Sequence, residues 1–344
     1  MKKILMSLLI LSAAATTKAQ DSKTPFSTRN FSASAIKSVE STTSGGNISV
    51  SGTATGQAAV EIYIQPGNSR KNYSKDEIQK KLNDDYDLRV EMEGSKLIAI
   101  AKPKKRNMDW NDALSISFKI TVAKATNTNL TTSGGNVSLN NLNGTQDFTT
   151  SGGNLNIDQV GGKLNGRTSG GNINVKNATD YLDLTTSGGN IDAESCSGEI
   201  KLSTSGGNVS LNQLKGNIDA TTSGGNVKGG SISGELEAHT SGGSVRLDGL
   251  ACALSASTSG GSIDIAIVEP VKFVKLSNSG GNIALSLPAG KGYDLRLSGS
   301  KIKTENFANF KGDIEEDEID GTINGGGVAV TVRASSGRVS VTMK

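Results

Sequence analysis

Aromatic residues, histidine, cysteine and proline are all scarce in this chain of 344 residues. Aromatic residues make up 4% of the sequence, and it holds one histidine, two cysteines and five prolines. Few aromatic rings leave little surface for the stacking by which many proteins hold sugars. A single histidine, His239, cannot form a metal site or a catalytic triad without partners at fixed spacing. We therefore interpret His239 as a surface side chain.

The N-terminus resembles a secretory signal peptide. Lys2 and Lys3 precede an apolar run over 4–11, and small residues flank Lys18 at a cleavage site before Gln20. A membrane anchor is the alternative, but a run of about eight apolar residues cannot cross a roughly 30 Å hydrocarbon core. No later segment has the length of a membrane span. We predict removal of residues 1–19 and export of the remainder.

Removal of this peptide also removes the excess of positive charge. The full chain has 36 basic and 33 acidic residues; without Lys2, Lys3 and Lys18 the numbers become 33 and 33. Nucleic-acid binding needs a basic stripe, and binding to anionic lipid needs net positive charge. The balance therefore argues against nucleic acid and anionic membrane as partners.

Glycine, in contrast, is abundant and periodic. There are 43 glycines, and Ser-Gly-Gly recurs with an 18-residue period over eight copies, followed by a ninth copy after a slightly longer interval. The copies begin at Ser133, Ser151, Ser169, Ser187, Ser205, Ser223, Ser241, Ser259 and Ser279. Such periodicity is typical of a repeat array and not of a disordered chain.

Within each repeat, apolar residues recur at fixed distances from the serine. If the serine is position zero, positions +4 and +6 alternate as in a strand with one face inward. Further apolar positions follow at +9, +13 and +15, Val268 among them. A repeat unit of this length fits one turn of a coil whose short strands stack in parallel, so the sequence predicts an all-β solenoid, or parallel β-helix. Eight turns would extend over roughly 40 Å.

The polar residues of the repeat have structural interpretations. We expect the Gly pair to form a corner with positive φ, and the asparagine that follows to stack from turn to turn in an inward amide ladder. The threonine before each Ser-Gly-Gly has the parity of the apolar positions. It is therefore expected to form an inward hydroxyl ladder.

The chain divides into four parts on this pattern. Residues 1–19 are the signal peptide, 20–126 an N-terminal rung with an irregular β region that caps the coil, 127–290 the repeats, and 291–344 degenerate rungs with a cap. Val39 to Val50 resembles an early rung, and an antiparallel patch of strands is expected to cover it. Ser74 and Glu77 form a capping box that opens one short helix. Residues 324–341 resemble the last rungs, closing the coil.

The Thr-Ser-Gly-Gly-Asn-Val/Ile series, together with Asn324-Gly-Gly-Gly and Ser336-Gly-Arg-Val339, is similar to the "putative adhesin" family of exported bacterial β-strand-repeat proteins, a domain of unknown function. The resemblance covers nearly all of the mature chain and implies a right-handed β-helix at the cell envelope. It assigns no binding residues. The chain departs from the pattern by a two-residue insertion around Glu269-Pro270 and by serine in place of asparagine at 244 and 262.

Cys196 and Cys252 lie three rungs apart, roughly 14 Å along the coil axis. A disulfide cannot bridge that distance, so we predict two free thiols. Cys196 occupies an apolar position and is expected in the core. Cys252 stands where most repeats have glycine, a position that could be exposed.

Outward-pointing polar residues offer the only candidate ligand contacts, and we expect no catalytic, cofactor or metal site. Five of them lie at position +5 from the serine and four at position +7. In the first set are Asn156, Asn174, Asp192, Arg246 and Asp264, and in the second Asp158, Lys176, Glu194 and Asp248. Their carboxylates alternate with other side chains, which favours a mixed solvated surface over a catalytic cluster. The acidic run at 313–320 could hold calcium but lacks a calcium-loop spacing, so we interpret it as a charged connecting loop.

The sequence leaves three functions open. The first is an exported, adhesin-like scaffold of the envelope or surface that binds glycans, matrix or surface proteins without catalysis. The second is a structural component that maintains the envelope, and the third is a carbohydrate-active β-helix enzyme. Ranks of threonine and serine could also order ice, although Arg167 and His239 interrupt them.

Overall fold

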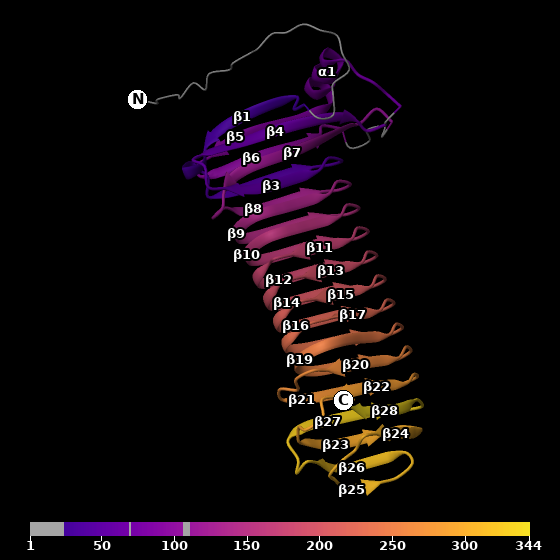
Figure 1. Cartoon of the computed structure of the whole chain (residues 1–344). Helices are drawn as coiled ribbons and strands as arrows, with labels where there is room; N and C mark the ends of the chain where they lie inside the picture. Colours follow the sequence, from indigo (N-terminus) through magenta and orange to yellow (C-terminus); the bar gives the residue numbers. More distant parts are fainter. Residues whose placement is uncertain (1–23, 69, 106–110) are drawn as a thin grey trace.

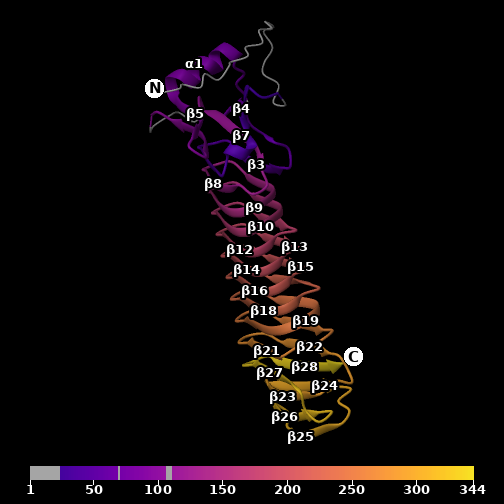
Figure 2. The same cartoon turned by 90° about the vertical axis from the view of Figure 1, so that its left-hand side faces the viewer.

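The computed structural model describes residues 24–68, 70–105 and 111–344; the predicted signal peptide lies outside this part of the chain. The protein is an elongated rod of stacked turns, with the single helix at one end and a hairpin at the other (Figures 1 and 2). The 28 strands of the described residues join in one continuous sheet. The predicted all-β class is confirmed. Among the described residues, no helix has the length and apolar character needed to cross a membrane.

The N-terminal region holds seven strands, a 3-10 turn and the helix. They are β1 (Ser27–Ser32), η1 (Ala33–Ala35), β2 (Ser38–Thr43), β3 (Ile48–Thr53), β4 (Gln57–Pro66), α1 (Lys75–Asp85), β5 (Tyr86–Glu93), β6 (Lys96–Pro103) and β7 (Leu114–Ala123). The predicted capping box is present at the start of α1: the Ser74 hydroxyl accepts from the Glu77 amide, and the Glu77 carboxylate accepts from the Ser74 amide. Ile78 and Leu82 are the buried residues of the helix.

The central array runs from β8 to β22. Its strands are β8 (Asn127–Thr132), β9 (Val137–Thr150), β10 (Leu155–Thr168), β11 (Ile173–Lys176), β12 (Thr179–Thr186), β13 (Ile191–Glu194), β14 (Ser197–Thr204), β15 (Val209–Asn212), β16 (Lys215–Thr222), β17 (Val227–Gly230), β18 (Ser233–Thr240), β19 (Val245–Thr258), β20 (Ile263–Ile267), β21 (Phe273–Asn278) and β22 (Ile283–Leu287). The C-terminal strands are β23 (Tyr293–Ser298), β24 (Lys301–Glu305), β25 (Phe310–Ile314), β26 (Glu318–Ile323), β27 (Val328–Ala334) and β28 (Arg338–Met343).

Through most of the array each residue pairs in parallel with its equivalent in the next turn, as Ile173 does with Ile191 and Leu182 with Ile200. Each turn contributes a short strand, such as β13, and a long strand, such as β14. In β9, β10 and β19 the two run together as one strand of 14 residues. We call the outer surface of β11, β13, β15, β17 and β20, and of the initial segments of β9, β10 and β19 that pair with them, the short-strand face. The long strands form the long-strand face.

The core lies between these two faces and consists of the predicted apolar positions. Along the short strands Ile191 and Ala193 are buried, and Leu182, Leu184 and Ile200 fill the space beneath the long strands. Because a single turn would leave these side chains in water, their burial depends on the turns above and below. The hydrophobic effect therefore acts along the whole rod.

The predicted inward threonine ladder is present. Each threonine hydroxyl donates to the carbonyl of the second glycine in the preceding turn at 2.7–2.8 Å, and accepts from the second glycine of its own turn at 3.2–3.4 Å. The ladder consists of Thr132, Thr150, Thr168, Thr186, Thr204, Thr222, Thr240 and Thr258, all buried. In the next turn Asn278 takes the same place, and its amide makes both kinds of bond. The hydroxyls thus satisfy backbone groups that are closed off from water.

The Gly-Gly corner has a different cause from the one expected. Neither glycine of the pair at 152–153 or 206–207 has a positive φ. The second glycine is required because backbones of successive turns approach closely: a Cβ on Gly207 would lie 2.0 Å from the carbonyl oxygen of Gly189. A Cβ on Gly206 would lie 3.6 Å from its nearest neighbour. The prediction of a positive-φ corner is therefore wrong.

Positive φ occurs instead at the bend that follows each short strand. Asn141, Gln159, Asn177, Ser195, Gln213 and Ser231 all have φ between 52° and 58°. Most turns then have a second left-handed position shortly afterwards, usually a glycine such as Gly198 or Gly216. The left-handed residues of each turn therefore lie at the bend after the short strand, whereas the bend at Ser-Gly-Gly, as at 205–207, has none.

The asparagine ladder forms, but at the surface. The Asn154 side-chain oxygen accepts from the Asn172 amide at 2.8 Å, and Asn172 serves Asn190 in the same way. These side chains are exposed or half-buried, so the expectation that they stack inward is wrong. The series continues with Ser244, whose hydroxyl accepts from the Ser262 amide at 3.1 Å.

Both ends of the rod depart from sequential stacking. At the N-terminal end, β2 lies between β8 and β6, and β3 lies between β9 and β7, all in parallel. The antiparallel pairs of the expected patch lie further out, where β5 pairs with β6 and where β4 pairs with β7 and β1. The first rung is therefore inside the stack.

The C-terminal end repeats this arrangement. Strand β27 lies between β21 and β23, and β28 lies between β22 and β24. Figure 1 shows the C-terminus beside β28, well above the hairpin of β25 and β26 that ends the rod. The expectation that residues 324–341 form the outermost turns is wrong, because the chain passes beyond them at 293–323 and then returns.

The two cysteines are free thiols, as predicted, and both are buried. The expectation of an exposed Cys252 is wrong. The connection between β20 and β21 is hydrogen-bonded to the Leu250 carbonyl through Val268 and Glu269, and pairing resumes at Leu254. Cys252 lies between Leu250 and Leu254 on β19, shares their inward orientation and belongs to the hydrophobic core. The insertion also moves Val268 out of its predicted core position: Val268 is 58% exposed, and Ile267 is buried in its place.

Candidate functional site

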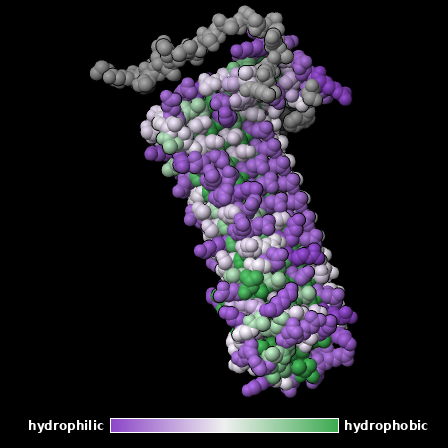
Figure 3. Space-filling model, in the orientation of Figure 1, coloured by the Kyte–Doolittle hydropathy of each residue, from purple (hydrophilic) through white to green (hydrophobic). Residues whose placement is uncertain are grey.

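All nine predicted ligand-facing residues lie on the outer surface of the rod, exposed or half-buried. They project from the short-strand face because strand geometry sends alternate side chains outward. Parallel stacking places equivalent residues of successive turns side by side, so each set forms a column along the rod. Figure 3 shows that the visible surface is mostly hydrophilic, with apolar patches toward the C-terminal end.

In the first turns of this face, outward side chains bind one another. Asn140 and Asn177 donate to the Asp158 carboxylate at 3.4 and 2.9 Å, and Asn174 donates to Asn156 at 3.2 Å. Lys176 and Glu194 form an ion pair of 2.6 Å, and this carboxylate raises the pKa of Lys176. The polar side chains of this part of the surface are therefore largely hydrogen-bonded or ion-paired to one another.

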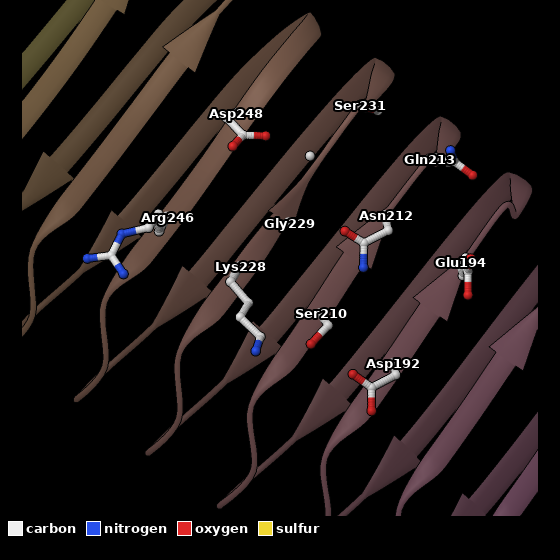
Figure 4. Close-up of a pocket in the computed structure, with 11 residues that line it drawn as sticks. Asp192, Glu194, Ser210, Asn212, Gln213, Lys228, Gly229, Ser231, Arg246 and Asp248 are labelled. Atoms are coloured by element: carbon white, nitrogen blue, oxygen red, sulfur yellow. The ribbon is translucent and has the colours of Figure 1, made fainter.

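Further along, the face is hollowed across β13, β15, β17 and β19 (Figure 4). The hollow has a volume of about 780 Å³. Its lining consists of Asp192, Glu194, Ser210, Asn212, Gln213, Lys228, Gly229, Gly230, Ser231, Arg246 and Asp248. Four of the predicted residues (Asp192, Glu194, Arg246 and Asp248) therefore come together, whereas Asn156, Asn174, Asp158, Lys176 and Asp264 lie outside the hollow.

The hollow lies where two glycines end β17. Gly230 occupies an outward position where the neighbouring turns carry Asn212 and Asp248. A Cβ there would lie 2.2 Å from a carboxylate oxygen of Asp248, so that side chain leans over the glycine. Gly229 has a φ of 151°, and a Cβ would lie 1.7 Å from the Leu211 carbonyl oxygen. Gly229 lies in the inward column between Leu211 and Leu247, so the missing side chain at Gly230 alone leaves a notch in an otherwise filled outward column.

Six side chains of the hollow have no hydrogen-bond or ion-pair partner among the residues that the structure describes. They are Asp192, Ser210, Asn212, Lys228, Ser231 and Asp248. Glu194, Gln213 and Arg246 are engaged with residues outside the hollow, which are Lys176, Ser195 and Asp264. Ser210 is only 8% exposed, whereas the other five are exposed. The hollow therefore holds donors and acceptors without partners, whereas in the earlier turns of this face the outward side chains bind one another.

This arrangement suits hydrogen bonding more than proton transfer. Asp192 and Asp248 supply acceptors, Lys228 supplies donors, and Ser210 and Asn212 supply both. No aromatic or aliphatic side chain of the described residues belongs to the lining. The site can thus recognise a polar ligand through several directed bonds, without an apolar contact.

The other candidates stay at the surface. His239 is half-buried, and its Nδ1 lies 2.9 Å from the Ser257 hydroxyl of the next turn. The acidic run lies in the hairpin of β25 and β26, where Glu316 pairs with Lys301 at 3.2 Å. No group of three metal-ligating residues occurs within residues 24–68, 70–105 and 111–344.

Sequence reasoning missed Ser210, Asn212, Gln213, Lys228 and Ser231, and the two glycines. The signal was present in Gly229-Gly230, two consecutive glycines in a strand that otherwise alternates. Gly230 interrupts an outward column of long polar side chains, which opens space. Among the described residues, Lys228 is the only free cation of the hollow, and its column neighbours are Ser210 and Arg246.

Comparison with known proteins gives a family-model match for part of the chain. No curated protein matches. A "putative cell adhesion protein" from Clostridium sporogenes aligns at 10% identity and a TM-score of 0.21, over 92% of this chain and 98% of its own. A "putative adhesin" from Parabacteroides merdae aligns at 14% identity and a TM-score of 0.31, over 92% of this chain and 96% of its own. The model of the Toastrack DUF4097 family matches residues 180–342, which include the hollow. Over these residues, the chain is similar to the Toastrack DUF4097 family.

Proposed function

We propose that this protein is an exported binding scaffold of the cell envelope or cell surface, adhesin-like in role and without catalysis. Its partners are glycans, matrix or surface proteins, which it contacts through the short-strand face. The scaffold is a right-handed coil with an 18-residue turn. Rigid stacking holds the outward side chains at fixed spacing, so little ordering entropy is lost when a partner binds.

The hollow is the single observation that carries this proposal. Buried polar groups normally find partners within the fold, and around Asp158 even the outward side chains do. Six polar side chains without partners on one concave surface favour a bound ligand there. Exposure to solvent weighs against catalysis, because a catalytic site gains most of its electrostatic effect from excluding water.

Two measurements test the proposal together. Protease or antibody should reach the protein on intact cells, and purified residues 20–344 should bind to a cell or matrix surface in a saturable way. A protein that becomes accessible only after the outer membrane is permeabilised, and that binds to no surface, would reject the adhesin-like role.

A structural role in the envelope is the second candidate, and the rod with strands closing both ends supports it. Deletion of the protein should then change envelope integrity while attachment stays normal. A carbohydrate-active enzyme is the third candidate. It requires sugar release by the purified protein that is lost on substitution of Asp192 or Asp248.

A further inference from the structure

We propose that the hollow over Gly229 and Gly230 binds an uncharged glycan chain that lies along the rod axis across β13, β15, β17 and β19. This inference deepens the proposed binding function and rests on it. It names the ligand class and the residues that contact the ligand.

The pattern of free groups suits a row of hydroxyls. A sugar hydroxyl is both donor and acceptor, so it is best held between a carboxylate and a donor group. Asp192 and Asp248 accept, Lys228 donates, and the Asn212 amide does both. In Figure 4 these side chains project from the same face of successive strands. Adjacent hydroxyls on one ring can therefore meet an acceptor and a donor at once.

Charge selects against ionic polymers. A polyanion passing over Lys228 would also meet the unpaired carboxylates of Asp192 and Asp248, and like charges without partners are costly. A polycation would meet Lys228 and the neighbouring Arg246. The lining holds charges of both signs, so an uncharged polar ligand avoids both penalties.

Apolar ligands are disfavoured by the same lining. The described residues around the hollow offer hydroxyl, amide, carboxylate, ammonium and backbone groups, and no aromatic ring or aliphatic side chain. A lipid tail or an apolar peptide would leave these polar groups without bonds. Hydrogen bonding therefore has to supply the affinity.

The dimensions indicate a chain and not a single sugar. From β13 to β19 the hollow covers three strand spacings, about 14 Å. This length matches a short oligosaccharide, with each turn of the rod presenting a pair of polar groups to one sugar unit. Lys228 lies in its middle, between Ser210 and Arg246 in its column and beside the notch at Gly230.

A glycan array tests this inference with purified residues 20–344. The array carries tetrasaccharides of three charge classes: chitotetraose, maltotetraose and laminaritetraose are uncharged, tetragalacturonate is acidic, and the chitosan tetramer is basic. We expect binding confined to one or more uncharged chains, followed by titration calorimetry on the best of them.

Paired variants locate the binding. Lys228→Ala and Asp248→Ala each remove a free group from the hollow and should weaken binding about tenfold or more. Lys215→Ala and Asp219→Ala are matched controls, since both are exposed on β16 of the long-strand face. The controls should bind as the unmodified protein does. Circular dichroism checks that all four variants are folded.

The outcomes separate this inference from the proposed function. Loss of sugar binding in the hollow variants, with binding to cell or matrix surfaces reduced in parallel, supports both. Unchanged affinity in Lys228→Ala and Asp248→Ala, preference for the acidic or basic chain, or no binding to any uncharged chain overturns the glycan inference. If the unmodified protein still binds surfaces in those cases, the scaffold function stands without it.

Discussion

The central array and the rungs at the two ends of the rod are held by the same kind of hydrogen bond, between parallel strands, but the paired strands are differently spaced along the chain. In the array, paired residues belong to consecutive turns, as in Leu155 and Ile173. At the ends the separations are larger: Ile48 pairs with Val137, and Ile283 pairs with Val339. Closing longer loops costs more conformational entropy. The array can therefore form turn by turn, whereas each end requires distant segments to meet.

This difference matters for solubility. A regular stack exposes an open strand edge at each end, which invites pairing with other chains. Here the first and last rungs are enclosed by strands that the chain adds beyond them, β6 and β7 at one end and β23 and β24 at the other. The irregular ends therefore cover the open strand edges of the array, which the regular turns alone would leave exposed.

The largest effect is expected from removal of residues 324–344. This truncation deletes β27 and β28 and so uncovers β21 and β22 on one side and β23 and β24 on the other. We expect insoluble or aggregated protein, measured by sedimentation and size-exclusion chromatography. A soluble monomer with an unchanged melting temperature would show that the inserted rung is not needed to close the rod.

Within the array, the two glycines of one corner should differ sharply. Gly207→Ala places a Cβ 2.0 Å from the Gly189 carbonyl oxygen, whereas Gly206→Ala meets nothing closer than 3.6 Å. We expect Gly207→Ala to lower the free energy of unfolding by about 3 kcal/mol or more. Chemical denaturation of the two variants checks this, and equal stability would contradict the close-approach explanation.

The threonine ladder predicts a smaller loss. Thr186→Val keeps the shape of the side chain but leaves the Gly171 carbonyl and the Gly189 amide without their hydroxyl partner. We expect a loss of about 1–3 kcal/mol. Thr185→Val, one residue earlier and half-buried on the outer side, is the control and should be nearly neutral. Thermal unfolding of both variants measures the difference.

The smallest effect concerns pH. Burial raises the pKa of the Cys252 thiol to about 11, above its value of 9.0 in an unfolded chain. The native state therefore favours the protonated thiol. This contribution to stability is complete below pH 9 and is lost as the pH rises from 9 toward 11. We expect Cys252→Ala to flatten that part of the stability profile, and the native thiols to react slowly with disulfide reagents at about pH 8.

Sequence columns predicted the repetitive part of the fold well because each turn repeats the same local constraint. Thr186, Ile191 and Cys196 lie where their columns placed them. The errors arose where a residue depends on a segment outside its own turn. Gly207 is fixed by the carbonyl of the turn before it, and Val268 is moved out of the core by the insertion around Glu269. Strand β27 lies between β21 and β23 because the chain first passes beyond this position and then returns to it, and the periodicity of the sequence gives no sign of that return.

The candidate site was predicted only in part for a similar reason. The outward columns identified Asp192, Glu194, Arg246 and Asp248, but a column pattern predicts the same structure for every turn and so does not predict a hollow at one of them. The hollow results from the missing outward side chain at Gly230, and its free cation from the lack of partners for Lys228 among the described residues. Both are visible only once neighbouring turns are in place.

The most direct test of the account is excision of one turn. Removal of Ser151–Thr168 deletes one complete 18-residue turn, keeps the phase of every column and leaves the hollow untouched, whereas removal of 151–167 leaves Thr168 behind and shifts the inward and outward faces. We predict that the first deletion folds into a shorter β-rich rod that still binds its surface partner, and that the second does not fold. Comparable circular dichroism and melting temperatures for the two variants would contradict the account.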